Sequence, residues 1–308
     1  MQAAPICGAI VAVVGLLGIC MPDPTAAETA NPAPSVERGA YLFAAAGCAG
    51  CHTDVKNDGP LLAGGRAIET PFGTFYGPNI TPDPEYGIGG WSDADFIRAL
   101  RHGVAPDGSH YYPAFPYTSF TGITDADLLD LKAYIFSLPP VAKPNKPHDL
   151  RFPFGWRFLL GFWKALNFTP GPFEPDPAQS AEWNRGAYLV QALTHCGECH
   201  TPRTAIGATD PSRSLAGTPD GPEGEPAPNI TPHPETGIGS WSRTELVRLL
   251  KTGMLPNFDV VGSFMGEVVE QSTGRLSEDD LRAIAVYLES LPPIDNPEAK
   301  ATQAGFDF

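Results

Sequence analysis

The chain has 308 residues, 20 basic and 35 acidic side chains, 34 prolines, 33 glycines and six cysteines, with a formal net charge of −15. The acidic balance argues against nucleic acid as a partner, because sequence-independent binding to phosphates depends on Lys and Arg. An apolar fraction of 42% excludes wholesale disorder. The length suggests about two domains, and the many prolines and glycines favour short helices joined by loops.

Residues 1–31 form the first predicted segment, an export signal or an N-terminal membrane anchor. Ala3–Met21 contains no ionisable side chain apart from Cys7 and Cys20, as is typical of targeting segments. No Lys or Arg precedes Arg38, so the basic start of a cleaved signal is missing, and the run approaches the roughly 20 residues that span a bilayer. We expect the protein to be exported to the periplasm and associated with the periplasmic face of a membrane.

The rest of the chain contains two copies of one unit. The recurring segments are Arg38–Leu42 and Arg185–Leu189, Asn79–Pro82 and Asn229–Pro232, Gly87–Ser92 and Gly237–Ser242, and Ser137–Pro140 and Ser290–Pro293. The offset between the copies grows from 147 to 153 residues, which indicates a duplication with loop insertions. We predict a first domain at 35–145, a linker at 146–180 and a second domain at 181–296.

Each copy carries matching helix signals. Ser92 and Ser242 each precede an acidic residue by three positions, the pattern of a capping box, and an apolar helix face follows. Gly103 and Gly253 suit the ends of these helices. A further helix in each copy ends before a Leu-Pro-Pro sequence, and the segments between the helices show no strand alternation. The expected fold class is therefore all-α, with long loops rich in proline and glycine.

The predicted linker is unusually aromatic. Between Leu150 and Phe173 it holds eight aromatic residues together with Arg151, Arg157 and Lys164. Aromatic rings and long cationic side chains are both stable at a membrane interface, so the segment resembles a short amphipathic piece that lies on a membrane. The alternative is a linker that is buried in the groove between the two domains.

Each copy has one CxxCH motif, made of Cys48, Cys51 and His52 in the first copy and Cys196, Cys199 and His200 in the second. This is the attachment signature of c-type haem. Thiols at positions i and i+3 lie on the same side of one helical turn and can form thioethers with the two haem vinyl groups, while the following imidazole binds the iron. We therefore predict two covalently bound haem c groups.

Other uses of these residues fit less well. A zinc ribbon needs two CxxC pairs about 15 to 20 residues apart, whereas these pairs are 148 residues apart. A thioredoxin-like redox pair needs a βαβ context, which the sequence lacks. Structural disulfides would leave the adjacent histidines unexplained.

Candidates for the sixth iron ligand follow from the few methionines of the chain. Met265 lies between the second motif and the last helix, where a returning chain can supply a thioether, so we expect it to bind the second haem. Met254 follows a helix end and is interpreted as packing. The first copy has Phe115 opposite Met265, so its haem needs a histidine, a ligand from elsewhere or an open face. His110 is the main local candidate, and His102 is the other.

Together, the CxxCH motifs, the Asn-Ile-Thr-Pro segments, Tyr112–Tyr117 and the Leu-Pro-Pro helix ends resemble the cytochrome c subunits of bacterial membrane-bound alcohol and gluconate dehydrogenases and related dihaem cytochromes c. The resemblance covers roughly residues 35 to 295. It implies two tandem cytochrome c domains, in each of which an N-terminal and a C-terminal helix cross beside the haem. Gly39 and Gly186 would permit the close approach, with Tyr134 and Tyr287 on the partner helices.

The sequence also departs from this family. Its dehydrogenase subunits typically carry three haem motifs, whereas this sequence has two. Family members often have methionine where Phe115 stands, so the two haems here are expected to differ in reduction potential.

Three functions remain open. The first is a dihaem electron carrier without catalytic residues, which passes electrons between donor and acceptor proteins in a periplasmic or membrane respiratory or photosynthetic chain. The second is the cytochrome subunit of a membrane-bound dehydrogenase, docked on a catalytic subunit through the aromatic segment. The third is a haem enzyme, a peroxidase or sulfur-compound oxidoreductase, that uses an open first haem.

Overall fold

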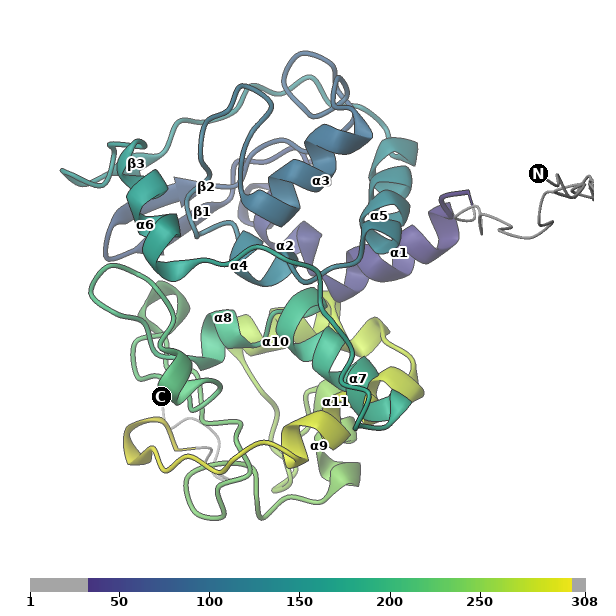
Figure 1. Ribbon diagram of the computed structural model, residues 1–308, viewed down its shortest axis with the longest axis vertical. Coiled ribbons are helices and arrows are strands. Elements are labelled where there is room, and N and C mark those ends of the chain that lie inside the picture. Colours follow the sequence, from purple (N-terminus) through teal and green to yellow (C-terminus); the bar gives the residue numbers. More distant parts are fainter. Residues whose placement is uncertain (1–32, 301–308) are drawn as a thin grey trace, which may run out of the picture. The chain divides into compact units, whose positions relative to one another are not determined.

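The computed structural model describes residues 33–300, so the predicted signal or anchor and Cys7 and Cys20 lie outside the described residues. The described chain is mostly helical, as predicted (Figure 1). Its α-helices are α1 (Val36–Ala45), α2 (Cys48–His52), α3 (Asp93–His102), α4 (Tyr117–Phe120), α5 (Asp125–Ser137), α6 (Leu159–Asn167), α7 (Ala181–Tyr188), α8 (Gly197–His200), α9 (Arg243–Thr252), α10 (Ser263–Gln271) and α11 (Glu278–Glu289). A π-helical turn, η2 (Leu189–Leu193), continues α7.

The first and last helices of each copy pack against each other, α1 on α5 and α7 on α11 (Figure 1). Glycine makes both crossings possible. A Cβ atom on Gly39 would lie 2.0 Å from the carbonyl oxygen of Asp130, and one on Gly186 would lie 1.9 Å from that of Ala283. Such distances leave no room for a methyl group, which confirms the expected close approach.

The predicted caps are present in both copies. Ser92 and Ser242 form full capping boxes at the starts of α3 and α9. Gly103 and Gly253 end these helices with φ values of 60° and 75°, in the left-handed region that favours glycine. The serine caps therefore determine where α3 and α9 begin, and the glycines determine where they end.

An ionic cluster joins the two copies at the start of α11. The carboxylate of Asp280 accepts hydrogen bonds from Arg185 Nε at 2.8 Å and Nη2 at 2.7 Å, both within the second copy. It also accepts a bond of 2.6 Å from the hydroxyl of Tyr41, which belongs to α1 in the first copy. Burial alone would raise the pKa of Asp280, but the bonds from Arg185 and Tyr41 outweigh it and lower this pKa.

The same arrangement recurs with the copies exchanged. Asp127 on α5 pairs with Arg38 of its own copy and accepts a hydrogen bond of 2.5 Å from the hydroxyl of Tyr188 on α7. The repeated Arg-Gly-Ala-Tyr-Leu segment thus binds an aspartate of its own copy through arginine and one of the other copy through tyrosine. One apolar core also runs through both copies, and all of residues 33–300 belong to one unit.

Replacing Asp280 with asparagine is expected to lower the free energy of unfolding at pH 7 by about 2–3 kcal/mol, because Arg185 loses its partner in a largely buried site. Since the folded state lowers the pKa of this carboxyl, its contribution is present above the unfolded value of about 3.9 and is lost as the pH falls through the lower folded pKa. Urea unfolding at pH 7 and near pH 3 should therefore show a smaller difference between the two proteins at the lower pH. Asp279→Asn, an exposed neighbour in the same helical turn, is the control. If Asp279→Asn and Asp280→Asn lower the free energy of unfolding equally, the pair of Asp280 with Arg185 does not stabilise the fold.

The structure also contains a small antiparallel sheet that the sequence analysis missed. Its strands are β1 (Ala67–Thr70), β2 (Gly73–Tyr76) and β3 (Asp149–Leu150), in the order β1-β2-β3. Strands of two to four residues are too short to show an alternating pattern. Phe75 of this sheet packs with Tyr112 and with Leu160 of α6 in a separate small core, so the sheet supports the aromatic segment.

Candidate haem sites

The first CxxCH motif forms the short helix α2, directly after α1. Gly47 has a φ of 60° and turns the chain between the two helices. The His52 ring lies with Nδ1 2.8 Å from the carbonyl oxygen of Pro78. Because a carbonyl can only accept, this contact places the proton on Nδ1 and leaves Nε2 with a free lone pair.

The second motif repeats this geometry on α8. Nδ1 of His200 lies 2.7 Å from the carbonyl oxygen of Pro228, which again fixes the tautomer with Nε2 free. His195 turns the chain before the motif with a φ of 43°. The hydroxyl of Thr194 lies 3.2 Å from the sulfur of Cys196.

The donor set fits c-type haem. The four motif cysteines are free thiols in the described chain, and burial raises the pKa of Cys48 and that of Cys199 to about 12. Burial also lowers the pKa of His52 and of His200, against the effect of the proline carbonyls. Each site therefore offers two thiols and a neutral imidazole within one short helical turn, and Cys51 is exposed. These are the groups that thioether formation and iron ligation use.

A zinc site finds no support in the described residues. Within 33–300 no three His, Cys, Asp or Glu side chains lie close enough together to hold a metal ion. The thiols and imidazoles of the two motifs therefore do not form the joint ligand set that a zinc ribbon needs.

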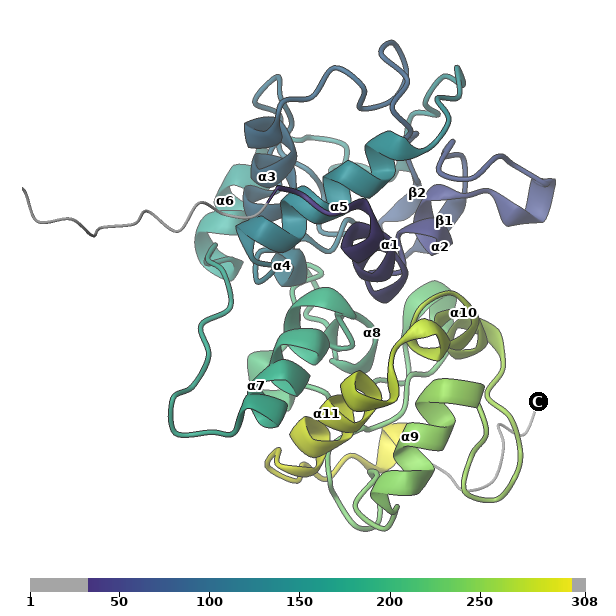
Figure 2. The same ribbon diagram turned by 90° about the vertical axis from the view of Figure 1, so that its right-hand side faces the viewer.

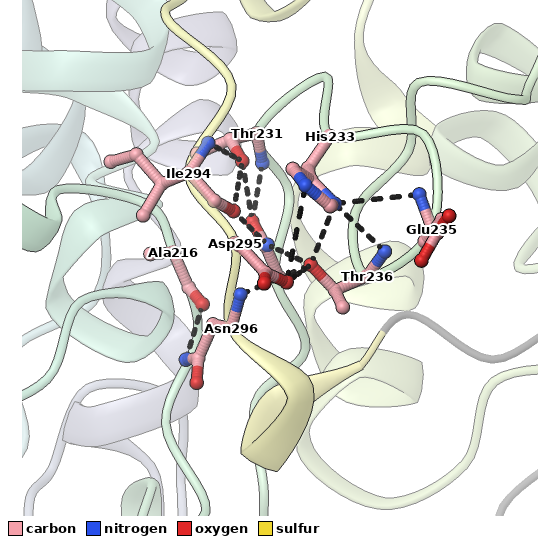
Figure 3. Close-up of polar contacts among 9 residues, drawn as sticks. Ala216, Thr231, His233, Glu235, Thr236, Ile294, Asp295 and Asn296 are labelled. Atoms are coloured by element: carbon pink, nitrogen blue, oxygen red, sulfur yellow. Dashed lines mark hydrogen bonds and ion pairs between the residues drawn. The ribbon is translucent and has the colours of Figure 1, made fainter.

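The repeated Asn-Ile-Thr-Pro segments hold the proline carbonyls in place. In the second copy, Thr231 Oγ1 accepts a bond of 3.1 Å from the backbone N–H of Ile294, which lies beyond α11. Figure 3 shows how this loop and the C-terminal segment meet, with Asn296 donating to the carbonyl oxygen of Ala216 at 2.7 Å. In the first copy, Thr81 Oγ1 accepts the matching bond of 3.1 Å from Val141 N–H. The repeat thus ties the loop beside each histidine to the chain that follows the last helix.

Met265 lies on α10 and is partly buried against the shared core. Helix α10 contacts α9 of its own copy and also α2 of the first copy. Phe115, its counterpart by sequence offset, lies before α4 and packs edge-to-face with Tyr111 and Phe120. A thioether and an aromatic ring therefore occupy corresponding stretches of the two copies.

His110 is held by α6 through Lys164. Its Nδ1 lies 3.2 Å from Lys164 Nζ, which also donates to the carbonyl oxygens of His102 at 2.7 Å and Gly103 at 2.6 Å. Burial, together with the nearby Lys164 charge, lowers the pKa of His110. Both candidates for the sixth ligand of the first haem therefore contact Lys164 of the aromatic segment. His110 does so through its ring, and His102 only through its backbone oxygen.

The second motif also receives side chains from the other copy. Glu198, inside the second motif, accepts hydrogen bonds from Thr118 at 2.7 Å and Ser119 at 2.8 Å, both on α4, and pairs with Arg203 at 2.6 Å. Burial would raise the pKa of Glu198, but Arg203 and the two hydroxyls lower it, so the carboxylate stays ionised. The second motif is thus linked to α4 of the first copy.

The first motif is linked to the second copy through Arg66, which belongs to its own copy. Arg66 donates to the carbonyl oxygen of Gly50 in the motif and to Glu267 on α10, both at 2.7 Å. Figure 2 shows α2 and α10 facing each other across this contact.

Several of these residues were not predicted from the sequence. Pro78 and Pro228 stand directly before the repeated Asn-Ile-Thr-Pro segments, so their place in the repeat was a signal that could have found them. Glu198 carries no such signal, because the hydroxyls it binds are distant in sequence. Lys164 was expected among the cationic side chains at a membrane interface, but it is buried and binds the end of α3.

Among the described helices, none is both long and apolar enough to cross a bilayer.

Residues 36–139 match the family model named Cytochrome c. The chain is 45% identical to a dihaem c-type cytochrome of Cereibacter sphaeroides, over 93% of this chain and 97% of that protein.

Two longer proteins are also similar. The fructose dehydrogenase cytochrome subunit of Gluconobacter japonicus is 44% identical over 92% of this chain. The cytochrome c subunit of the quinone-dependent alcohol dehydrogenase of Gluconacetobacter polyoxogenes is 42% identical over 87% of this chain. The chain spans only 57% and 58% of the lengths of these two proteins.

Proposed function

Because the chain belongs to the family of dihaem c-type cytochromes and carries two covalently bound haem c groups, we propose which residues hold each of them. The attachment sites are Cys48 and Cys51 with His52 as the proximal ligand, and Cys196 and Cys199 with His200 as the proximal ligand. The observation that carries this proposal is that both imidazoles donate Nδ1–H to a proline carbonyl, with free thiols in the same helical turn.

Each bound haem supplies a one-electron iron couple, and the chain's own residues set its surroundings. The thiols fix the position of the group, and the imidazoles present Nε2 to the metal. The carbonyls of Pro78 and Pro228 orient the rings and raise the basicity of the ligating nitrogen. We also propose two tandem cytochrome c domains, at 35–145 and 181–296, each with one haem.

The protein transports electrons, as its family does. We propose that it is exported to the periplasm and carries single electrons between a donor and an acceptor protein on the membrane surface. The net charge of −15 favours association with a basic surface on such a partner, and this association should be faster at low salt.

A role as a dehydrogenase subunit is the second candidate, because two of its relatives carry that name. It predicts stoichiometric co-purification with a larger catalytic chain. Isolation as a free, fully haem-loaded protein, with no partner retained on a mild affinity column, would count against it.

The function is tested by a spectroscopic redox titration of the haem-loaded protein. We expect two reversible one-electron couples and no bond-making turnover. Carbon monoxide added to the reduced protein then reports open iron sites. If neither haem responds, both are six-coordinate and the haem enzyme alternative fails. If one haem of the unaltered protein binds carbon monoxide, that alternative gains support.

His110 remains our candidate for the sixth position of the first haem, a role that requires it to leave Lys164. The variant His110→Ala should then open one haem to carbon monoxide. An unchanged response would show that His110 does not bind iron.

Replacing Met265 with leucine is expected to lower the reduction potential of one couple and to open one haem to carbon monoxide, because a thioether ligand raises the potential. Leucine has nearly the same volume and keeps the packing of α10. Met254→Leu is the matched control, because Met254 forms a backbone β-bridge with Val260 and is not expected to bind iron. It should change neither the reduction potentials nor the binding of carbon monoxide. The role of Met265 is refuted if both couples keep their potentials and no haem binds carbon monoxide.

A further inference from the structure

The aromatic segment at 150–168 is fixed to the protein along one side of α6. Leu160 is buried in the small core with Phe75 and Tyr112. Lys164, one turn later, is buried and donates to two backbone carbonyl oxygens at the end of α3. The indole N–H of Trp163 donates to the carbonyl oxygen of Ile206 at 2.9 Å. The segment is therefore an anchored element with a defined inner side.

Its other side is apolar and exposed. Phe158, Phe162 and Leu166 follow each other at four-residue spacing, so they form one stripe opposite Leu160 and Lys164. Their exposed fractions are 64%, 70% and 82%. We call six exposed apolar side chains of this segment the aromatic face: Phe152, Phe154, Trp156, Phe158, Phe162 and Leu166. The alternative of a linker buried in the groove between the two copies does not fit these six exposed side chains.

The charge of the aromatic segment itself differs from that of the whole chain. Residues 150–173 contain no Asp or Glu, although the chain has a net charge of −15. Arg151 and Arg157 are exposed within the face. Arg157 also donates to the carbonyl oxygen of His110 at 3.2 Å, which keeps the arginine at the base of the face.

We propose that the aromatic face docks on the surface of a lipid bilayer that contains anionic lipids. Exposed rings with flanking arginines suit the headgroup region, where the rings enter the acyl boundary and the guanidinium groups pair with lipid phosphates. An otherwise acidic surface is repelled by such a membrane, so this basic and apolar face selects the orientation of docking. The inference rests on the membrane location in the proposed function and adds the surface and the ligand chemistry.

Hydrogen exchange of the full, haem-loaded chain with and without vesicles tests the proposal. With mixed phosphatidylcholine and phosphatidylglycerol vesicles, we expect slower amide exchange in peptides that cover residues 150–168. Pure phosphatidylcholine should protect the same peptides less. The exchange is measured in residues 150–168 alone, so binding of the vesicles through residues 1–31 would not produce the same protection.

A variant with Phe152, Phe158, Phe162 and Leu166 all changed to serine should lose this protection and bind vesicles about tenfold more weakly or worse. The control Phe258→Ser removes an equally exposed ring, 74% accessible, from the second copy and should bind as the unaltered protein does. The serine variant must keep both redox couples, which separates failure of docking from failure of the proposed electron transfer. Equal exchange in residues 150–168 with and without vesicles overturns the proposal, as does protection that arises only from an added dehydrogenase subunit.

Discussion

The double variant Cys196→Ala and Cys199→Ala is expected to contain one haem per chain instead of two and to lose one of the two redox couples. Without the thiols no thioether can form in the second motif, and the imidazole of His200 alone does not retain the group through purification. The pyridine haemochrome assay and a redox titration measure the two effects together.

The variant Cys48→Ala and Cys51→Ala is the matched experiment in the first motif. It should remove the other couple and leave the couple of the second motif in place. If either pair of substitutions leaves two haems per chain, the assignment of the attachment residues is wrong.

Gly186→Ala is expected to destabilise the folded protein by about 3 kcal/mol or more, since α7 and α11 must move apart to admit a methyl group. The new Cβ would lie 1.9 Å from the carbonyl oxygen of Ala283 and 2.9 Å from Cβ of Tyr287. For a chain of this size such a loss corresponds to a decrease in Tm of about 6–12 °C, which circular dichroism of the haem-loaded protein can follow.

Gly90→Ala serves as the control, because a Cβ at Gly90 meets no atom within 4 Å. Its Tm should change by no more than about 2 °C, the size expected of a surface substitution. Equal stability of the two variants would show that the helix crossing does not depend on the glycine.

Local patterns in the sequence predicted much of the fold. The capping boxes at Ser92 and Ser242 and the terminal glycines after these helices depend on residues a few positions apart, and all are present as predicted. The crossing at Gly186 was also anticipated, but from the resemblance to a known family. Helix existence and helix ends are thus largely local properties of this chain.

Contacts between distant residues could not be predicted in the same way. Asp280 follows Ser277 by three positions, the spacing of a capping box, and Ser277 accepts from its backbone N–H. The carboxylate, however, binds Arg185 and Tyr41 instead of returning to the cap. The sequence around Asp280 does not show whether its carboxylate returns to the cap or binds a distant group, because Tyr41 lies 239 positions away.

The candidate haem sites show the same difference between local and distant contacts. Two thiols and an imidazole within five residues are a local signature, so both motifs could be located from the sequence. The sixth ligands depend on how α10 and the loop at His110 lie relative to each motif, and chain spacing does not determine that arrangement.

The most direct test of the account is peptide mapping by tandem mass spectrometry of the protein produced in a host that attaches haem c. The account predicts one haem on the peptide with Cys48 and Cys51 and a second on the peptide with Cys196 and Cys199. An unmodified thiol pair in either motif, or haem attached to any other peptide, would contradict it.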